Sequence, residues 1–402
     1  MMLSGMALAY MYSLLLFFVQ NLILVPSSRA KVPAIIVFGD STVDTGNNNY
    51  IPTIAKCNFQ PYGRDFPGGF PTGRFCNGRL PPDFLSEYFG LKPTIPAYLD
   101  PAYNISDFAT GVCFASAATG YDNATADILE VIPLWKEVEN FRDYKKRLSD
   151  YLGIEKANEI LREAIYIVSI GTNDFIENYY PMQMRRSQFT VKEYQDFLIG
   201  IAENFFNQIY HLGARKISLT GLSPMGCLPS ERTANFQDPF SCNEEYNNVA
   251  LEFNRKMKNF VAKLNRELPG IRVVYSEIYD FILEIITKPS KFGFEVAEIG
   301  CCGTGTFEAG FLCHQDNPFT CTDADKSNFK PYGRDFPGGV PTGRFYNGRI
   351  FPDFLSESAG LKPTIPAYLD PMYNISDFSV GVCFASAAAG FDNCSVYLLV
   401  SA

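Results

Sequence analysis

Residues 34–46 read AIIVFGDSTVDTG, a short apolar run that ends abruptly in polar residues. The run from Ala34 to Phe38 followed by Gly-Asp-Ser is typical of a buried strand that ends in a turn. Three further runs have the same form, namely Ala164–Ile170, Lys216–Thr220 and Arg272–Tyr275. Their length and apolar content predict buried parallel strands whose carboxyl ends carry polar residues.

Helical patterns lie between these runs. They cover Ile128–Leu152, Ile154–Glu163, Val191–Leu212 and Cys242–Leu268. The alternation of strands and helices predicts an α/β protein with a doubly wound parallel sheet. In such a sheet the chemistry gathers at the carboxyl ends of the strands, so we expect functional side chains at Ser41 and Asn173.

Composition and charge restrict the class of protein. The chain has 402 residues, of which 47% are hydrophobic and 19% charged, and its formal net charge is −9. The apolar content is sufficient for a full core and excludes wholesale disorder. The negative charge argues against nucleic acid as the main partner. The length fits two or three domains, or one large domain with additional segments.

The N-terminal segment indicates the compartment. The stretch from Met6 to Val25 is almost wholly apolar, and small residues at Ser28 and Ala30 suit a signal peptidase. We therefore interpret residues 1–30 as a signal peptide and expect a secreted, extracellular protein. A single membrane anchor is the alternative, and Gln20 and Asn21 within the run count against it. No later run is long enough to span a membrane.

Secretion gives a meaning to two other features. Asn104, Asn123, Asn374 and Asn393 begin Asn-x-Ser/Thr sequons and are candidate glycosylation sites. The 11 cysteines are interpreted as disulfide partners, with at least one left over because the count is odd. They cluster at Cys227 and Cys242 and again at Cys301, Cys302, Cys313 and Cys321. With only two histidines in the chain, the sequence argues against a Cys/His zinc site.

Part of the chain occurs twice. Residues 58–123 and 328–393 align at a constant offset of 270 and differ at 12 of 66 positions. The second copy lacks the strand before the first copy and everything after it, so it cannot build a second core. We therefore divide the mature chain into a domain over 31–326 and a partial duplicate over 327–402. The duplicate is loosely ordered, competes with 58–123 for its docking site, or results from the fusion of neighbouring genes.

The residues at the strand ends have functional and structural interpretations. Ser41 at a helix start is a nucleophile stabilised by the helix dipole, or a plain N-cap. Asn173 is an oxyanion donor, or a turn asparagine. The small residues of Gly111–Gly120 permit close backbone approach, or serve tight packing alone.

In combination these motifs are specific. GDS, GVCFASAATGYDN, IGTNDF and GLSPMGCLP, in this order, resemble the plant GDSL esterase/lipase family of the SGNH hydrolases, from Pro33 to about Lys326. The resemblance implies a secreted carboxylic ester hydrolase with a three-layer α/β/α, flavodoxin-like sheet and no metal or organic cofactor. The implied substrate is a small-molecule or lipid ester. Ser41 matches the nucleophile, Asn173 the oxyanion asparagine, and Ala118 the oxyanion glycine that donates its backbone N–H. Gly120 is the alternative match.

The catalytic base of the family has no counterpart. The family carries Asp-x-x-His shortly after the cysteine-rich tail, whereas here FTCTDADK runs into the second copy, which holds no histidine. His211 is interpreted as a solvated helix residue. His314, oriented by Asp316 or Asp323, is a weak candidate. Loss of a triad histidine costs about 10⁶ in turnover, so we expect severe impairment.

A different class of function is the alternative. The protein is then a non-catalytic secreted binder of lipid or acylated glycan that uses the former acyl cleft. A structural wall protein is disfavoured by the α/β enzyme core. The sequence predicts neither the acyl specificity nor the oligomeric state.

Overall fold

The computed structural model describes residues 32–233, 241–294 and 297. The predicted signal peptide, His314, the later cysteine cluster and the duplicate at 327–402 lie outside the described residues. Within the described ranges, none of the helices combines the length and apolar character that a membrane span requires.

Five parallel strands form one sheet in the order β2-β1-β3-β4-β5. This confirms the predicted doubly wound α/β fold. The chain leaves β1 for one edge of the sheet and returns to pair β3 on the other side of β1. The carboxyl ends of β1 and β3 therefore flank the point where the winding reverses, which is the usual binding site in such sheets. The strands are β1 (Ile35–Gly39), β2 (Gly111–Cys113), β3 (Ile165–Ser169), β4 (Lys216–Thr220) and β5 (Arg272–Ser276).

Two of the helices begin and end at the predicted residues. These are α6 and α8, while α5 begins later than expected because Pro133 separates it from the short α4. The helices are α2 (Pro81–Tyr88), α3 (Ile105–Phe108), α4 (Asn123–Ile128), α5 (Leu134–Leu152), α6 (Ile154–Glu163), α7 (Gln183–Gln188), α8 (Val191–Leu212), α9 (Pro229–Thr233), α10 (Glu244–Glu267) and α11 (Tyr279–Thr287). Shorter helical turns are η1 (Asn47–Tyr50), η2 (Asp174–Tyr179), η3 (Met225–Cys227) and η4 (Pro289–Phe292).

Capping residues explain why α8 and α10 begin where they do. Thr190 accepts from the backbone N–H of Glu193, and the Glu193 carboxylate accepts in return from the Thr190 N–H. Asn243 caps α10 by accepting from the backbone N–H groups of Glu245 and Tyr246. Gly213 ends α8 at a φ of 129°, which favours glycine.

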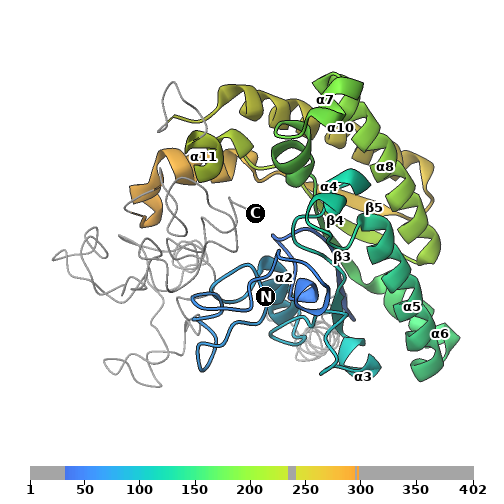
Figure 1. Ribbon diagram of the computed structural model, residues 1–402. Helices are drawn as coiled ribbons and strands as arrows, with labels where there is room; N and C mark the ends of the chain where they lie inside the picture. Colours follow the sequence, from blue (N-terminus) through green and yellow to red (C-terminus); the bar gives the residue numbers. More distant parts are fainter. Residues whose placement is uncertain (1–31, 234–240, 295–296, 298–402) are drawn as a thin grey trace, which may run out of the picture.

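The two faces of the sheet are covered unequally. The side chains of Ile36 and Phe38 join the larger core, which includes the buried residues of α5, α6, α8 and α10. These helices lie together along one side of the sheet in Figure 1, whereas α2 lies on the other side. Ile35 and Val37 join a smaller core on the α2 side.

The second face is thinly covered over β4 and β5. Val274 on β5 is 56% exposed, and the hydroxyls of Ser218 and Ser276 on these strands bond each other at 2.9 Å. An apolar residue on a central sheet normally packs against another layer. Among the described residues, the third layer is therefore complete only near β1.

The cysteines of the described part behave in two ways. Cys227 and Cys242 form a disulfide, which confirms for these two the prediction that the cysteines are disulfide partners, although the sequence did not predict which cysteines pair. Cys57 and Cys113 remain buried thiols, so the expectation that the cysteines pair in general is wrong for them. Each is held inside the core by a contact to a backbone carbonyl, that of Gly73 for Cys57 and that of Val43 for Cys113.

Candidate active site

Ser41 lies in the tight turn that follows β1. The carbonyl of Asp40 accepts from the backbone N–H groups of Val43 and Asp44, and the Asp40 carboxylate accepts from Thr42. The turn leaves Ser41 only 4% exposed. No helix begins here, because residues 41–43 are a turn. The prediction that Ser41 lies at a helix start and is stabilised by the helix dipole is therefore wrong.

The turn is tied to the end of β3. The Asp40 N–H donates to the carbonyl of Ser169 at 3.0 Å, and the hydroxyls of Thr42 and Ser169 lie 2.8 Å apart. These two contacts extend the pairing of β1 with β3 beyond the end of β1. It places the residues after β3 beside the Ser41 turn.

Asn173 follows β3 at the start of η2, which is a π-helix. Its side chain is buried and its Nδ2 donates to the carbonyl of Thr119 at 2.9 Å. An amide nitrogen carries two hydrogens, so one remains for another acceptor. The wide π turn is a local feature that often occurs at functional sites.

Ala118 has a backbone conformation that favours glycine. Its φ is 66°, in the left-handed region, which costs about 1 kcal/mol for a residue with a Cβ. The neighbouring N–H groups donate to Asp44 and to the carbonyl of Ser116, whereas that of Ala118 has no acceptor among the described residues. Ala118 thus presents a backbone donor in a glycine-like turn.

Gly120 is required for another reason. A Cβ at this position would lie 2.2 Å from the Asp174 carboxylate, which accepts from the N–H groups of Tyr121 and Asp122. The glycine allows Asp174 to approach the backbone.

The backbone N–H of Ser41 is a donor that the sequence did not single out. In the part of the chain that the structure describes, it has no acceptor either. Three donors without an acceptor among the described residues therefore come from the loops after β1, β2 and β3: the N–H of Ser41, the N–H of Ala118 and one amide hydrogen of Asn173. Such donors can stabilise an oxyanion.

The polar run DTGNNN positions the loop after β2. The Asp44 carboxylate accepts from the N–H groups of Gly46, Asn47 and Ala117. Asn47 donates to the carbonyls of Cys113 and Ala115, and Asn48 donates to that of Ala117. In the sequence, the run DTGNNN is a cluster of short polar side chains after a strand, and no role was predicted for it.

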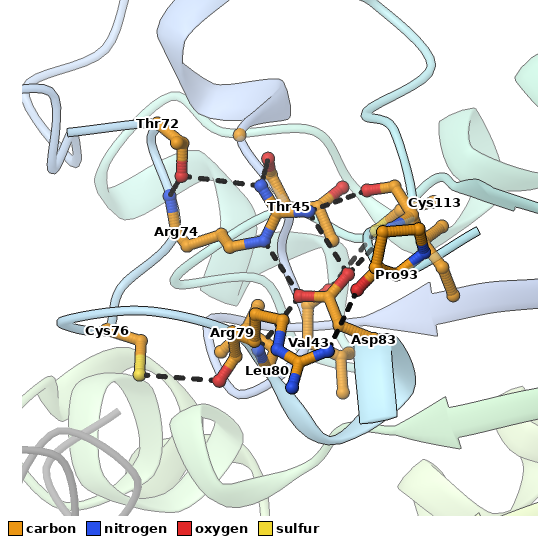
Figure 2. Close-up of polar contacts among 12 residues, drawn as sticks. Val43, Thr45, Thr72, Arg74, Cys76, Arg79, Leu80, Asp83, Pro93 and Cys113 are labelled. Carbon is orange, nitrogen blue, oxygen red and sulfur yellow. Dashed lines mark hydrogen bonds and ion pairs between the residues drawn. The ribbon is translucent and has the colours of Figure 1, made fainter. Parts of the chain in front are cut away.

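A buried ion pair attaches the segment before β2 to the same region (Figure 2). Arg74 contacts both carboxylate oxygens of Asp83, at 2.9 and 3.2 Å, and donates to the carbonyls of Thr45 and Ile95. Asp83 accepts in addition from the N–H groups of Leu80 and Ile95. Both charged groups are thus fully bonded although almost no solvent reaches them.

Several carboxyl groups with raised pKa values lie in and beside the loops that follow β1, β2 and β3. Glu137 of α5 accepts from the Gly39 N–H at 3.0 Å, and burial raises the pKa of its carboxyl well above the ordinary value. Burial raises the pKa of Asp40 to about 7 and that of Asp174 to about 7. Burial, and then the charges of Asp40 and Asp174, raise the pKa of Glu177 to about 8. The site thus holds acidic groups that titrate near neutral pH.

These raised pKa values predict that stability falls as the pH rises. The folded protein holds protons that the unfolded chain releases near pH 4, so the stabilisation is complete at lower pH and is lost up to about pH 8. We expect the free energy of unfolding to be greater at pH 5 than at pH 8, by up to about 3 kcal/mol for each of these groups. Glu177→Gln, which cannot ionise, should flatten this dependence in urea unfolding at both pH values. An unchanged slope in the variant would show that Glu177 does not ionise in this range.

The one histidine among the described residues is remote from Ser41. His211 is exposed in the last turn of α8, which leads into the start of β4. It therefore lies at the amino edge of the sheet, whereas Ser41 lies at the carboxyl edge. His314, Asp316 and Asp323 lie outside the described residues. Among the described residues, no group of three or more His, Cys, Asp and Glu side chains has the arrangement of a metal site.

Known proteins resemble this chain over most of its length. The family model described as GDSL-like lipase/acylhydrolase matches residues 35–317. Three GDSL esterase/lipases of Arabidopsis thaliana are 64%, 60% and 58% identical to it, over 306, 315 and 299 residues. The alignments cover 76%, 78% and 74% of this chain and 87%, 90% and 85% of those proteins.

Solved structures also match this chain. A gut microbial diltiazem-metabolizing enzyme aligns with a TM-score of 0.29 and 14% identity, over 68% of this chain and 42% of its own.

Proposed function

Since the chain belongs to the GDSL-like lipase/acylhydrolase family, we propose that it is a secreted ester hydrolase of the acyl-serine type whose sequence lacks the usual catalytic base. The family supports carboxylic ester hydrolysis of small-molecule or lipid esters. Secretion, the signal peptide and glycosylation of the chain are part of the proposal and are supported by its N-terminal sequence and its sequons.

In this proposal Ser41 is the nucleophile. Its Oγ attacks the ester carbonyl, and the oxyanion is held by the backbone N–H groups of Ser41 and Ala118 and by the Asn173 amide. The observation that carries the assignment is that the two N–H groups and one hydrogen of the Asn173 amide come from the loops after β1, β2 and β3 and lack acceptors among the described residues. The alcohol leaves, and water then hydrolyses the acyl-serine.

Proton transfer is the impaired step. The mechanism needs a base on Ser41 Oγ, and the exposed His211 is at the wrong edge of the sheet. No Asp-x-x-His occurs in the sequence. Oxyanion stabilisation and binding alone leave about 10³–10⁴ over water.

The lack of a catalytic base also favours a second candidate, a non-catalytic protein that binds lipid or acylated glycan. Hydrolysis of a short-chain nitrophenyl ester separates the two. For the full chain we expect a turnover about 10⁶-fold below that of an Arabidopsis relative, and little further change in Ser41→Ala, because triad groups act as a unit. Turnover within about tenfold of the relative, abolished by Ser41→Ala, contradicts the impairment. Saturable fatty-acid binding that Ser41→Ala retains supports the second candidate.

A further inference from the structure

A cavity that Ser41 does not line lies between the start of α5, α7 and the middle of α8. Its volume is about 360 Å³, within the range of small-molecule sites. Its apolar wall includes Leu134, Phe197 and Ile201, and polar side chains at Asn123, Asn204 and Gln208 complete the lining. The mixture of an apolar wall and amide groups suits a ligand with an apolar face and several hydroxyls.

The backbone around Asn123, beside this cavity, is rigid. Asn123 is exposed, lines the cavity and begins the sequon Asn123-Ala124-Thr125. The backbone N–H of Asp122, the preceding residue, donates to the Asp174 carboxylate at 3.0 Å. The Thr125 hydroxyl donates to the same carboxylate at 2.7 Å. A group bonded to Asn123 Nδ2 would therefore leave the protein in a defined direction.

The Asp122 carboxylate makes this turn rigid on its other side. It accepts from the N–H of Ala124 at 3.1 Å and forms a two-bond ion pair with Arg185, at 2.6 and 2.8 Å. Arg185 itself lines the cavity. A ligand in the cavity would shield this ion pair from water and strengthen it.

The only tryptophan of the chain also lines the cavity. Trp135 is 49% exposed on the first turn of α5, and the Lys136 ammonium lies over its ring at 5.9 Å from the centroid. A large exposed aromatic ring beside amide groups is a surface on which the C–H face of a sugar ring can pack. Asn204 is exposed and its Oδ1 accepts from Gln208, which leaves its Nδ2 directed to other acceptors.

We propose that Asn123 carries an N-linked glycan whose first sugars occupy this cavity and pack on Trp135. The glycan is then part of the folded structure and covers the ring and the Asp122–Arg185 pair. This inference rests on the proposed secretion, because the modification is made in the secretory pathway.

Trp135 is a built-in reporter for the test. The full chain is secreted from a host that adds N-glycans, and the modified sites are mapped by peptide mass spectrometry. The native protein is then treated with peptide N-glycosidase, and quenching of the tryptophan fluorescence by acrylamide is measured. We expect Asn123 to be modified and the quenching constant to rise about twofold on treatment, since a sugar covers one face of a two-faced ring.

Asn123→Gln is the matched control, since it removes the sequon but spares the buried Thr125 hydroxyl. The variant should start at the higher quenching constant and stay there after treatment, although glycans elsewhere are removed. An unmodified Asn123 in a protein that carries a glycan at Asn104 overturns the inference and leaves secretion intact. An unchanged quenching constant on removal of an Asn123 glycan overturns the packing on Trp135. A retained chain without any glycan overturns the proposed secretion and this inference with it.

Discussion

A chimaera in which residues 327–402 are replaced by an Asp-x-x-His segment and final helix from a family member should hydrolyse esters between about 10⁴- and 10⁶-fold faster than the present chain. The reason is that, in the proposed mechanism, the oxyanion donors around Ser41 are already arranged and only the proton acceptor is missing. The measurement is turnover of a nitrophenyl ester by both proteins. The added helix should also cover Val274 and raise the urea midpoint, because β5 exposes 56% of this side chain.

Two controls separate rescue of catalysis from rescue of folding. Alanine at the grafted histidine, and Ser41→Ala in the chimaera, should each return the turnover to that of the present chain and keep the higher urea midpoint. Asn173→Ala in the chimaera should lower turnover by about 10²–10³ if its amide holds the oxyanion. A chimaera that gains stability and no Ser41-dependent turnover would contradict the assignment of Ser41.

Asp83→Ala should lower the free energy of unfolding by about 3–5 kcal/mol. The substitution leaves the guanidinium of Arg74 buried without its carboxylate, and it also removes the acceptor for two backbone N–H groups. Because Arg74 also donates to the Thr45 carbonyl, the loss should loosen the polar run that positions Ala117 and Ala118. Urea unfolding followed by far-ultraviolet circular dichroism measures the change.

The chain supplies two matched controls for this variant. Glu159→Ala removes an exposed ion pair with Lys156 on α6 and should cost less than about 0.5 kcal/mol. Asp353 is the same residue in the second copy of the segment, 270 positions later. Asp353→Ala should have little effect if the first copy alone fills the docking site. An equal loss in both aspartate variants would mean that both copies contribute to the folded core.

The sequence predicted most reliably those elements whose ends are set by local chemistry. α6 and α8 agree with their expected bounds because apolar periodicity and end residues such as Thr190 and Gly213 act within a few positions. β4 agrees for a similar reason, since an isolated apolar run between a helix and a polar loop has few alternatives. The break before α5 was missed although Pro133 marks it, because the apolar pattern continues across the break.

Other features depend on partners far along the chain. β2 has only three residues, and it is a strand because Gly111 to Cys113 pair with β1, not because of local propensity. The turn at Ser41 replaces the expected helix start because Asp40 bonds Ser169, which is remote in sequence. The glycine-like conformation of Ala118 and the π turn after Asn173 follow from packing against these loops.

For this protein the sequence by itself determined the parallel α/β class, the family, and the lack of an Asp-x-x-His, since these depend on patterns and residue identities along one chain. Only the tertiary structure decided which donors near Ser41 lack acceptors among the described residues, that the described His211 lies at the opposite edge of the sheet, and that Asn123 lines a cavity with Trp135. Hydrogen-bond satisfaction, burial and the pKa values that follow from them are properties of groups brought together from distant positions. A linear pattern contains the groups but not their distances.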